Sequence, residues 1–119
     1  MHRSDHFEEA GGTLATADSG QFSTQSGHTA TLANLASTGT FNVVNNSALR
    51  LQGTINNTGA LNLNSAGNFT DLLISGAATL AGNGTTTLSN TSANRVMADS
   101  AGAVLTVGNA QTLQGAGQL

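Results

Sequence analysis

The sequence TGTFNV at residues 38–43 returns as TGALNL at residues 58–63. Both hexamers have the form T-G-x-Φ-N-Φ, where Φ is an apolar residue. A globular domain with a single core gives no reason for such a repeat. In a chain that coils on itself, each turn presents the same side chain to the turns above and below it. A repeat at an interval of roughly 20 residues therefore predicts a solenoid.

A shorter frame, G-x-Φ-x-Φ with a threonine allowed in one Φ position, begins at five glycines. These are Gly20, Gly39, Gly59, Gly84 and Gly102, and only the step from Gly59 to Gly84 is clearly longer than the others. Their alignment gives two columns: Phe22, Phe41, Leu61, Thr86 and Val104, then Thr24, Val43, Leu63, Leu88 and Thr106. Residues between the columns point outward, which is strand periodicity. We expect an all-β parallel solenoid (β-helix) of about five coils of roughly 20 residues.

The inward positions of these coils define a predicted core. Apolar ladders between coils are the main burial available to a rod, so these side chains should stack in columns. The predicted core is Phe22, Phe41, Val43, Leu49, Leu51, Ile55, Leu61, Leu63, Phe69, Leu73, Leu80, Leu88, Val104 and Leu113.

Two other folds of short strands remain as alternatives. An antiparallel sandwich also consists of short strands, but its hairpins give no reason to repeat side chains at one interval. Val43, Leu49, Ile55 and Leu61 are spaced as in left-handed hexapeptide helices. That run fails at Gly67 and contains no histidine, so the solenoid with the longer coil is favoured.

Composition narrows the range of partners. Only 8% of the residues are charged, against about 25% in typical domains, and Lys, Pro, Cys, Trp and Tyr are absent. Three arginines without a lysine make no basic patch, so nucleic acid and anionic membrane surfaces are not expected partners. No apolar run reaches the length that crosses a membrane, so membrane insertion is not expected either.

Residues 1–10 fall outside the repeat, and the predicted solenoid domain covers residues 11–119. Ser4 or Asp5 is a candidate N-cap for one helical turn that ends at Gly11. The segment is therefore either a short helix that closes the open end of the solenoid or a leader or tag. It also lacks the apolar core of a signal peptide.

Three residues in this segment have the spacing of metal ligands on one helical face. His2, His6 and Glu9 stand at i, i+4 and i+7. A mobile terminus beside the starting methionine explains them better than a metal site does. We therefore expect neither a metal nor a cofactor.

The carboxylates are too few and too scattered for polysaccharide chemistry. β-Helical lyases and hydrolases need clustered carboxylates, or carboxylates beside basic residues, on one outer face. The repeat region offers only Asp18, Asp71 and Asp99, together with Arg50 and Arg95. Asp71 and Asp99 are separated by more than one coil, so they become neighbours only if an insertion intervenes. No catalytic residue is assigned, and we expect that the chain is not an enzyme.

The T-G-x-Φ-N-Φ blocks and the closing TVGNAQTLQGAGQL at residues 106–119 resemble passengers of bacterial secreted adhesins. These are the filamentous-haemagglutinin-like exoproteins of two-partner secretion and related autotransporter passengers, and the resemblance covers about residues 11–119. It implies a right-handed parallel β-helix secreted to the bacterial cell surface. It further implies a role in adhesion, biofilm cohesion or display, with surface glycans or proteins as partners. This family has no fixed catalytic residues to carry over.

Two features depart from that resemblance. The N-terminus shows neither a signal nor a secretion domain, so the resemblance implies a slice of a longer protein. The longer step from Gly59 to Gly84 implies an irregular coil or an external loop.

The ends of the predicted solenoid favour self-association. Its first and last coils expose unpaired backbone groups, and such edges template further strands. The C-terminal GQL at residues 117–119 repeats the start of GQF at 20–22, and no charged residue follows Asp99. We therefore expect end-to-end association through the C-terminal coil, and assembly into a filament is the alternative to adhesion.

Overall fold

The computed structural model describes residues 7–10, 13–14 and 21–118, and these residues form twelve β-strands and no helix. The strands are β1 (Phe7–Ala10), β2 (Thr13–Leu14), β3 (Gln21–Ser23), β4 (Thr29–Ser37), β5 (Thr40–Val44), β6 (Ala48–Asn57), β7 (Ala60–Asn64), β8 (Thr70–Ala81), β9 (Thr85–Leu88), β10 (Asn94–Ala98), β11 (Val104–Val107) and β12 (Thr112–Gly115).

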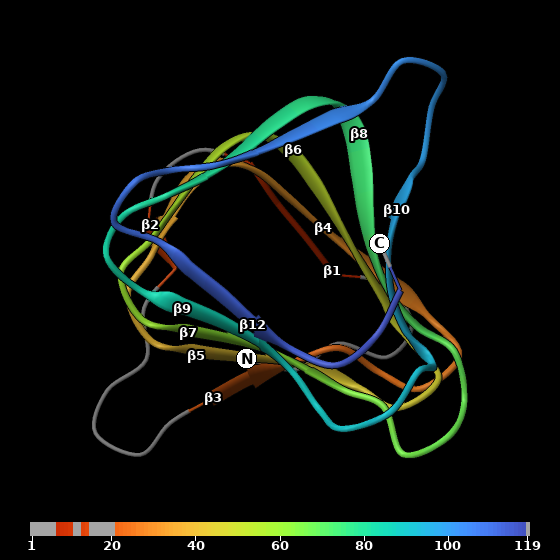
Figure 1. Ribbon diagram of the computed structural model, residues 1–119. Helices are drawn as coiled ribbons and strands as arrows, with labels where there is room; N and C mark the ends of the chain where they lie inside the picture. The colour runs from red at the N-terminus through yellow and green to blue at the C-terminus, as the bar shows by residue number, and fades with distance from the viewer. Residues whose placement is uncertain (1–6, 11–12, 15–20, 119) are drawn as a thin grey trace.

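The strands stack in about three turns of a parallel β-solenoid, which confirms the predicted fold class. One sheet has five strands in the order β12-β9-β7-β5-β3. The other has seven, in the order β1-β4-β6-β8-β10, with β2 paired to β4 and β11 paired to β8. Figure 1 looks along the stack, so that β5, β7, β9 and β12 overlie one another along one side of the coil.

The long strands β4, β6 and β8 turn a corner and supply the other two sides of the coil. A register shift marks the bend, between Ala33 and Leu35 where β4 pairs with β6, and between Gln52 and Gly53 where β6 pairs with β8. In the next turn the same path is split: β10 pairs with the first half of β8 and β11 with its second half. The residues between β10 and β11 form the loop that projects from this corner in Figure 1.

The predicted count of about five coils is wrong, because the strands stack in about three turns. One of the five glycine frames also lies on a different side of the coil from the other four. Val104 does not continue the column of Phe22, Phe41, Leu61 and Thr86. It lies in β11 and pairs with Ala77 of the other sheet. Leu113 of β12 pairs with Thr86 instead. The same G-x-Φ-x-Φ pattern therefore occurs on two different sides of the coil.

The core is continuous through the stack and largely follows the predicted ladders. Nine predicted residues are buried: Phe41, Val43, Leu49, Leu51, Ile55, Leu61, Leu63, Leu80 and Leu88. Phe22 and Leu113 are partly buried and pack against these residues. The buried cluster also includes six residues that were not predicted, namely Ala30, Leu32, Leu35, Leu72, Ile74 and Ala78.

Three of the predicted core residues are wrong. Phe69 is 56% exposed at the corner before β8, and Val104 is 57% exposed on the outer side of β11. Leu73 lies between the buried residues Leu72 and Ile74 and so faces the opposite side of β8, where it is only half-buried. Each error places the inward register of a strand one residue or one side away from its true position.

The structure also corrects the expected N-terminal helix. Residues 7–10 form β1, which pairs in parallel with β4 in the register Phe7 to Ala30. The solenoid thus includes residues N-terminal to the expected boundary at Gly11. Residues 1–6, with His2 and His6, lie outside the described residues, as does Asp18.

Candidate functional site

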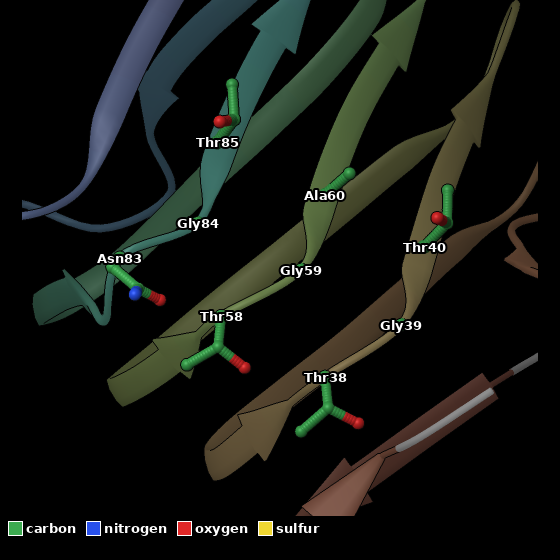
Figure 2. A pocket seen from close by; sticks show the side chains of 9 residues that line it. All are labelled: Thr38, Gly39, Thr40, Thr58, Gly59, Ala60, Asn83, Gly84 and Thr85. Atoms are coloured by element: carbon green, nitrogen blue, oxygen red, sulfur yellow. The ribbon is translucent and has the colours of Figure 1, made fainter. Parts of the chain in front are cut away.

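A groove of about 440 Å³ runs along the corner that precedes β5, β7 and β9. It is lined by the repeated T-G blocks and their counterpart in the next turn: Thr38, Gly39, Thr40, Thr58, Gly59, Ala60, Asn83, Gly84 and Thr85. Figure 2 shows bare glycine backbone between a row of Thr38, Thr58 and Asn83 and a second row of Thr40, Ala60 and Thr85. The groove offers hydroxyl, amide and backbone groups and no titratable side chain.

The glycines in this groove are required by the close approach of successive coils. A Cβ atom on Gly59 would lie 2.0 Å from the carbonyl oxygen of Gly39, and one on Gly84 would lie 2.4 Å from that of Gly59. The backbone N–H groups of Ala60 and Thr85 donate to the same two carbonyl oxygens, each at 3.0 Å. The repeated T-G of the sequence therefore follows from backbone contact between coils.

A buried polar cluster lies beneath this corner. Asn57 is 2% exposed, and its side-chain amide donates to Gln111 Oε1 at 3.1 Å. Gln111 donates in return to the carbonyl oxygens of Asn57 at 3.1 Å and Ala81 at 2.9 Å. Thr86 completes the cluster with a hydrogen bond to Gln111 Oε1 at 3.1 Å. Because these groups satisfy one another, the cluster stabilises the corner and leaves no polar atom aimed at a ligand.

The outer face of the five-stranded sheet is an uncharged array of amide and hydroxyl groups. Asn62 and Asn64 donate from their side chains to Asn42 Oδ1 at 3.0 and 3.3 Å. Gln114 donates to Thr87 Oγ1 at 3.2 Å. These bonds link outward side chains along the stack, so the polar groups of this face are held in fixed positions.

The charged side chains gather on the other sheet. Arg95 of β10 donates from Nε and Nη2 to the two oxygens of Asp71 on β8, at 2.7 and 2.8 Å. The same guanidinium lies over the ring of Phe69, 3.8 Å from its centroid. The hydrogen bond with Asp71, assisted by the charge of that carboxylate, raises the pKa of Arg95 above its ordinary value. The guanidinium of Arg95 and the carboxylate of Asp71 therefore neutralise each other.

A second ion pair connects β6 to the residue that follows β10, although β8 lies between these two strands in the sheet. Arg50 of β6 donates to Asp99 Oδ2 at 2.5 Å, and Asp99 follows β10. Arg50 also donates to Thr31 Oγ1 at 3.1 Å. Each of these ion-paired side chains keeps about 30% of its surface exposed, so the pair contributes at most about 1 kcal/mol to stability.

The longer turn does bring the segments of Asp71 and Asp99 together, but the two carboxylates do not form a catalytic pair. Asp71 is level with Arg95, and Asp99 stands four residues further along, about 13 Å at the rise of a parallel strand. Paired carboxylates in glycosidases lie within about 10 Å of each other. Each of these carboxylates is also bound by an arginine.

No group of three metal-ligating side chains occurs among the described residues. Glu9 belongs to strand β1, so the helical spacing that would have joined it to His2 and His6 does not apply at its position. In the same part of the chain no helix is long and apolar enough to cross a membrane.

Comparison with known proteins finds no match for this chain among protein-family models, curated proteins or solved structures.

Proposed function

We propose that the chain is an adhesive structural segment of a large secreted protein of the bacterial cell surface, serving adhesion, biofilm cohesion or display. The observation that carries this proposal is the distribution of charge. Among residues 22–118 only Arg50, Asp71, Arg95 and Asp99 carry charged side chains, and each is bound in an ion pair. The described strands of the five-stranded sheet carry none. A rigid, uncharged and repeating face suits many weak contacts with another surface.

We also propose that the solenoid is right-handed, as the resemblance to filamentous-haemagglutinin-like and autotransporter passengers implies. Connections between parallel strands of one sheet are right-handed in about 98% of cases. With the N-terminal strands farthest from the viewer in Figure 1, the chain runs anticlockwise as it approaches, which supports this winding.

An enzyme that acts on polysaccharides is the less favoured proposal. General acid–base catalysis needs a group that can exchange a proton with the substrate. The described carboxylates, Asp71 and Asp99, each accept hydrogen bonds from an arginine and lie apart. The ion pairs instead join one turn of the solenoid to another.

The adhesive role predicts that display of the chain makes a non-adherent bacterium adhere to a surface. Displayed on such a cell through an unrelated carrier, it should raise retention on epithelial cells or plastic several-fold over the carrier alone. The Val43→Asp variant, displayed at equal density, is the unfolded control and should give no retention. Retention equal to that of the carrier would contradict the proposal, as would polysaccharide turnover that Asp71→Asn abolishes.

Self-assembly into filaments is the second candidate, and the last turn of the solenoid favours it. Strand β12 stands at the end of its sheet, so one of its edges has no partner strand among the described residues. In the same turn Val104 and Val107 are 57% and 38% exposed, and Leu113 is only partly buried. Unpaired edges with apolar side chains promote strand addition.

Light scattering across protein concentration tests this second candidate. The apparent mass should rise with concentration and change little with salt, because few charges are involved. Leu113→Lys should remain folded by circular dichroism and stay monomeric. A wild-type chain that is strictly monomeric at high concentration would exclude end-to-end association.

A further inference from the structure

Phe69 is an aromatic side chain on the surface, held in a fixed position. The residue is 56% exposed, whereas Phe22 and Phe41 stack with each other inside the solenoid. The guanidinium of Arg95 covers one face of the Phe69 ring, 3.8 Å from its centroid. Because that guanidinium is held by the two hydrogen bonds that it donates to Asp71, the ring is held in turn. Since the guanidinium covers one face of the ring and the residue is still more than half exposed, we infer that the other face is open to solvent.

The corner that carries the ring is rigid for a second reason. Asn45, in the turn before, accepts hydrogen bonds at its Oδ1 from the backbone N–H groups of Ala66 and Asn68, at 2.7 and 3.1 Å. The backbone N–H of Asn46 donates to Thr70 Oγ1 at 3.1 Å. These bonds fix the loop before Phe69 to the corresponding corner of the preceding turn, at Asn45 and Asn46.

Among the described residues, the surroundings of the ring are polar, and the charged side chains there, Arg95 and Asp71, are paired with each other. Arg95 lies one turn further along the chain than Phe69, on β10, whereas Asn46 lies one turn before it. The side chains of Asn46 and Asn68 are exposed at this corner. The nearest cation, Arg95, is neutralised by Asp71. An anionic ligand would have to compete with that carboxylate, whereas a neutral ligand would not.

The geometry points to Phe69 as a stacking platform for a neutral sugar ring of a surface glycan. A sugar ring has an apolar C–H face that matches an aromatic ring and a rim of hydroxyl groups that match exposed amides. Sites of this kind combine an aromatic surface with a few fixed polar groups. Arg95 is a positioning residue here, since it holds the ring in place before the ligand arrives and so lowers the entropy lost on binding. This inference rests on the proposed adhesive function.

Fluorescence offers a direct test, because the chain contains no Trp or Tyr. In Phe69→Trp the introduced indole is the only strong fluorophore. Cellohexaose, chitohexaose, laminarihexaose and maltohexaose are titrated up to about 10 mM, where a site with a millimolar Kd is mostly occupied. At least one should shift the emission to the blue with saturation. An emission spectrum that none of the four sugars changes would overturn the inference, and so would a response to heparin alone or to an apolar peptide alone.

Calorimetry with the sugar that binds then separates the ring from its surroundings. Phe69→Ala should weaken binding about tenfold or more relative to wild type. Arg95→Gln should weaken it several-fold by releasing the ring, while Arg95→Lys, which keeps a charge but loses the fork, should restore little. Met97→Ala is the matched control. Met97, on β10, is an exposed apolar residue like Phe69, and its substitution should leave the affinity unchanged. Equal affinity of wild type and Phe69→Ala would overturn the platform.

The experiments distinguish failure of the Phe69 platform from failure of the adhesive function. If displayed wild-type chains adhere and Phe69→Ala chains adhere equally well, the platform is wrong and the adhesive function stands. If the sugar binds at Phe69 but displayed chains do not adhere, the platform stands and the adhesive function is wrong.

Discussion

The Val43→Asp variant should fail to fold. Val43 is fully buried on β5, and its register partner on β7, Leu63, is equally buried. An ionised carboxylate at this position would lie in the apolar ladder without a partner, at a cost of several kcal/mol. Since a whole domain is stable by only about 5–15 kcal/mol, such a loss removes most of the folded population. Circular dichroism should show the β-signal lost, and urea titration should show no cooperative transition.

The neighbouring residue provides the control for this experiment. Val44 is the same residue type on the same strand, but it points outward and is only half-buried. Val44→Asp should change the free energy of unfolding by about 0.5 kcal/mol, as surface substitutions usually do. Comparable loss in both variants would mean that the inward register of β5 is wrong.

The second large effect is expected from Gly59→Ala. The added methyl group would lie 2.0 Å from the carbonyl oxygen of Gly39, which is backbone and cannot rotate away. The coils would have to separate at this corner and stretch the hydrogen bond from Ala60 N to Gly39 O. Overpacking of this kind costs about 1–3 kcal/mol or more, and a clash with backbone belongs at the upper end of that range. The midpoint of urea unfolding should fall accordingly.

Gly108→Ala is the matched control, because Gly108 stands before β12, two turns beyond Gly59, and has more space. A Cβ atom there would lie 3.2 Å from the carbonyl oxygen of Leu80, its nearest neighbour. That contact is still tight and needs a shift of a few tenths of an ångström, so the substitution should destabilise the protein much less than Gly59→Ala does. If it destabilised the protein as much as Gly59→Ala, loss of glycine would matter at these corners for a reason other than the distance between coils.

The repeat frame was sufficient to predict the parallel stack and most of its core. Columns through Phe41 and Leu61, and through Val43 and Leu63, appear in the structure as direct register partners. Such columns can be recognised in the sequence because stacked coils bury residues that recur at a constant interval. The inward positions of the seven-stranded sheet were harder to predict from the sequence. Its long strands bend, and at each bend the register shifts, so the alternation of inward and outward residues is interrupted.

The frame at Gly102 shows why period alone misassigned a turn. Short strands on every side of the coil follow the same alternation, so G-x-Φ-x-Φ identifies a strand without identifying its side. Assigning the side requires the partner strand, and β11 pairs with the second half of β8 rather than with β9. The Arg95–Asp71 pair and the exposed ring of Phe69 could not be predicted for the same reason, since both depend on which residues of successive turns are level.

Two contacts described above skip a turn, and they change how the stack comes apart under load. In a simple stack each coil touches only its neighbours, so a pulling force can peel off the last coil by itself. Here Asn57 of β6 bonds to Gln111, just before β12, and Arg50 of β6 bonds to Asp99, just after β10. Each joins the first and third of three consecutive layers across β8. We therefore expect the last layer to resist peeling more than a stack with nearest-neighbour contacts alone would, because detaching it also breaks bonds to the layer beyond β8.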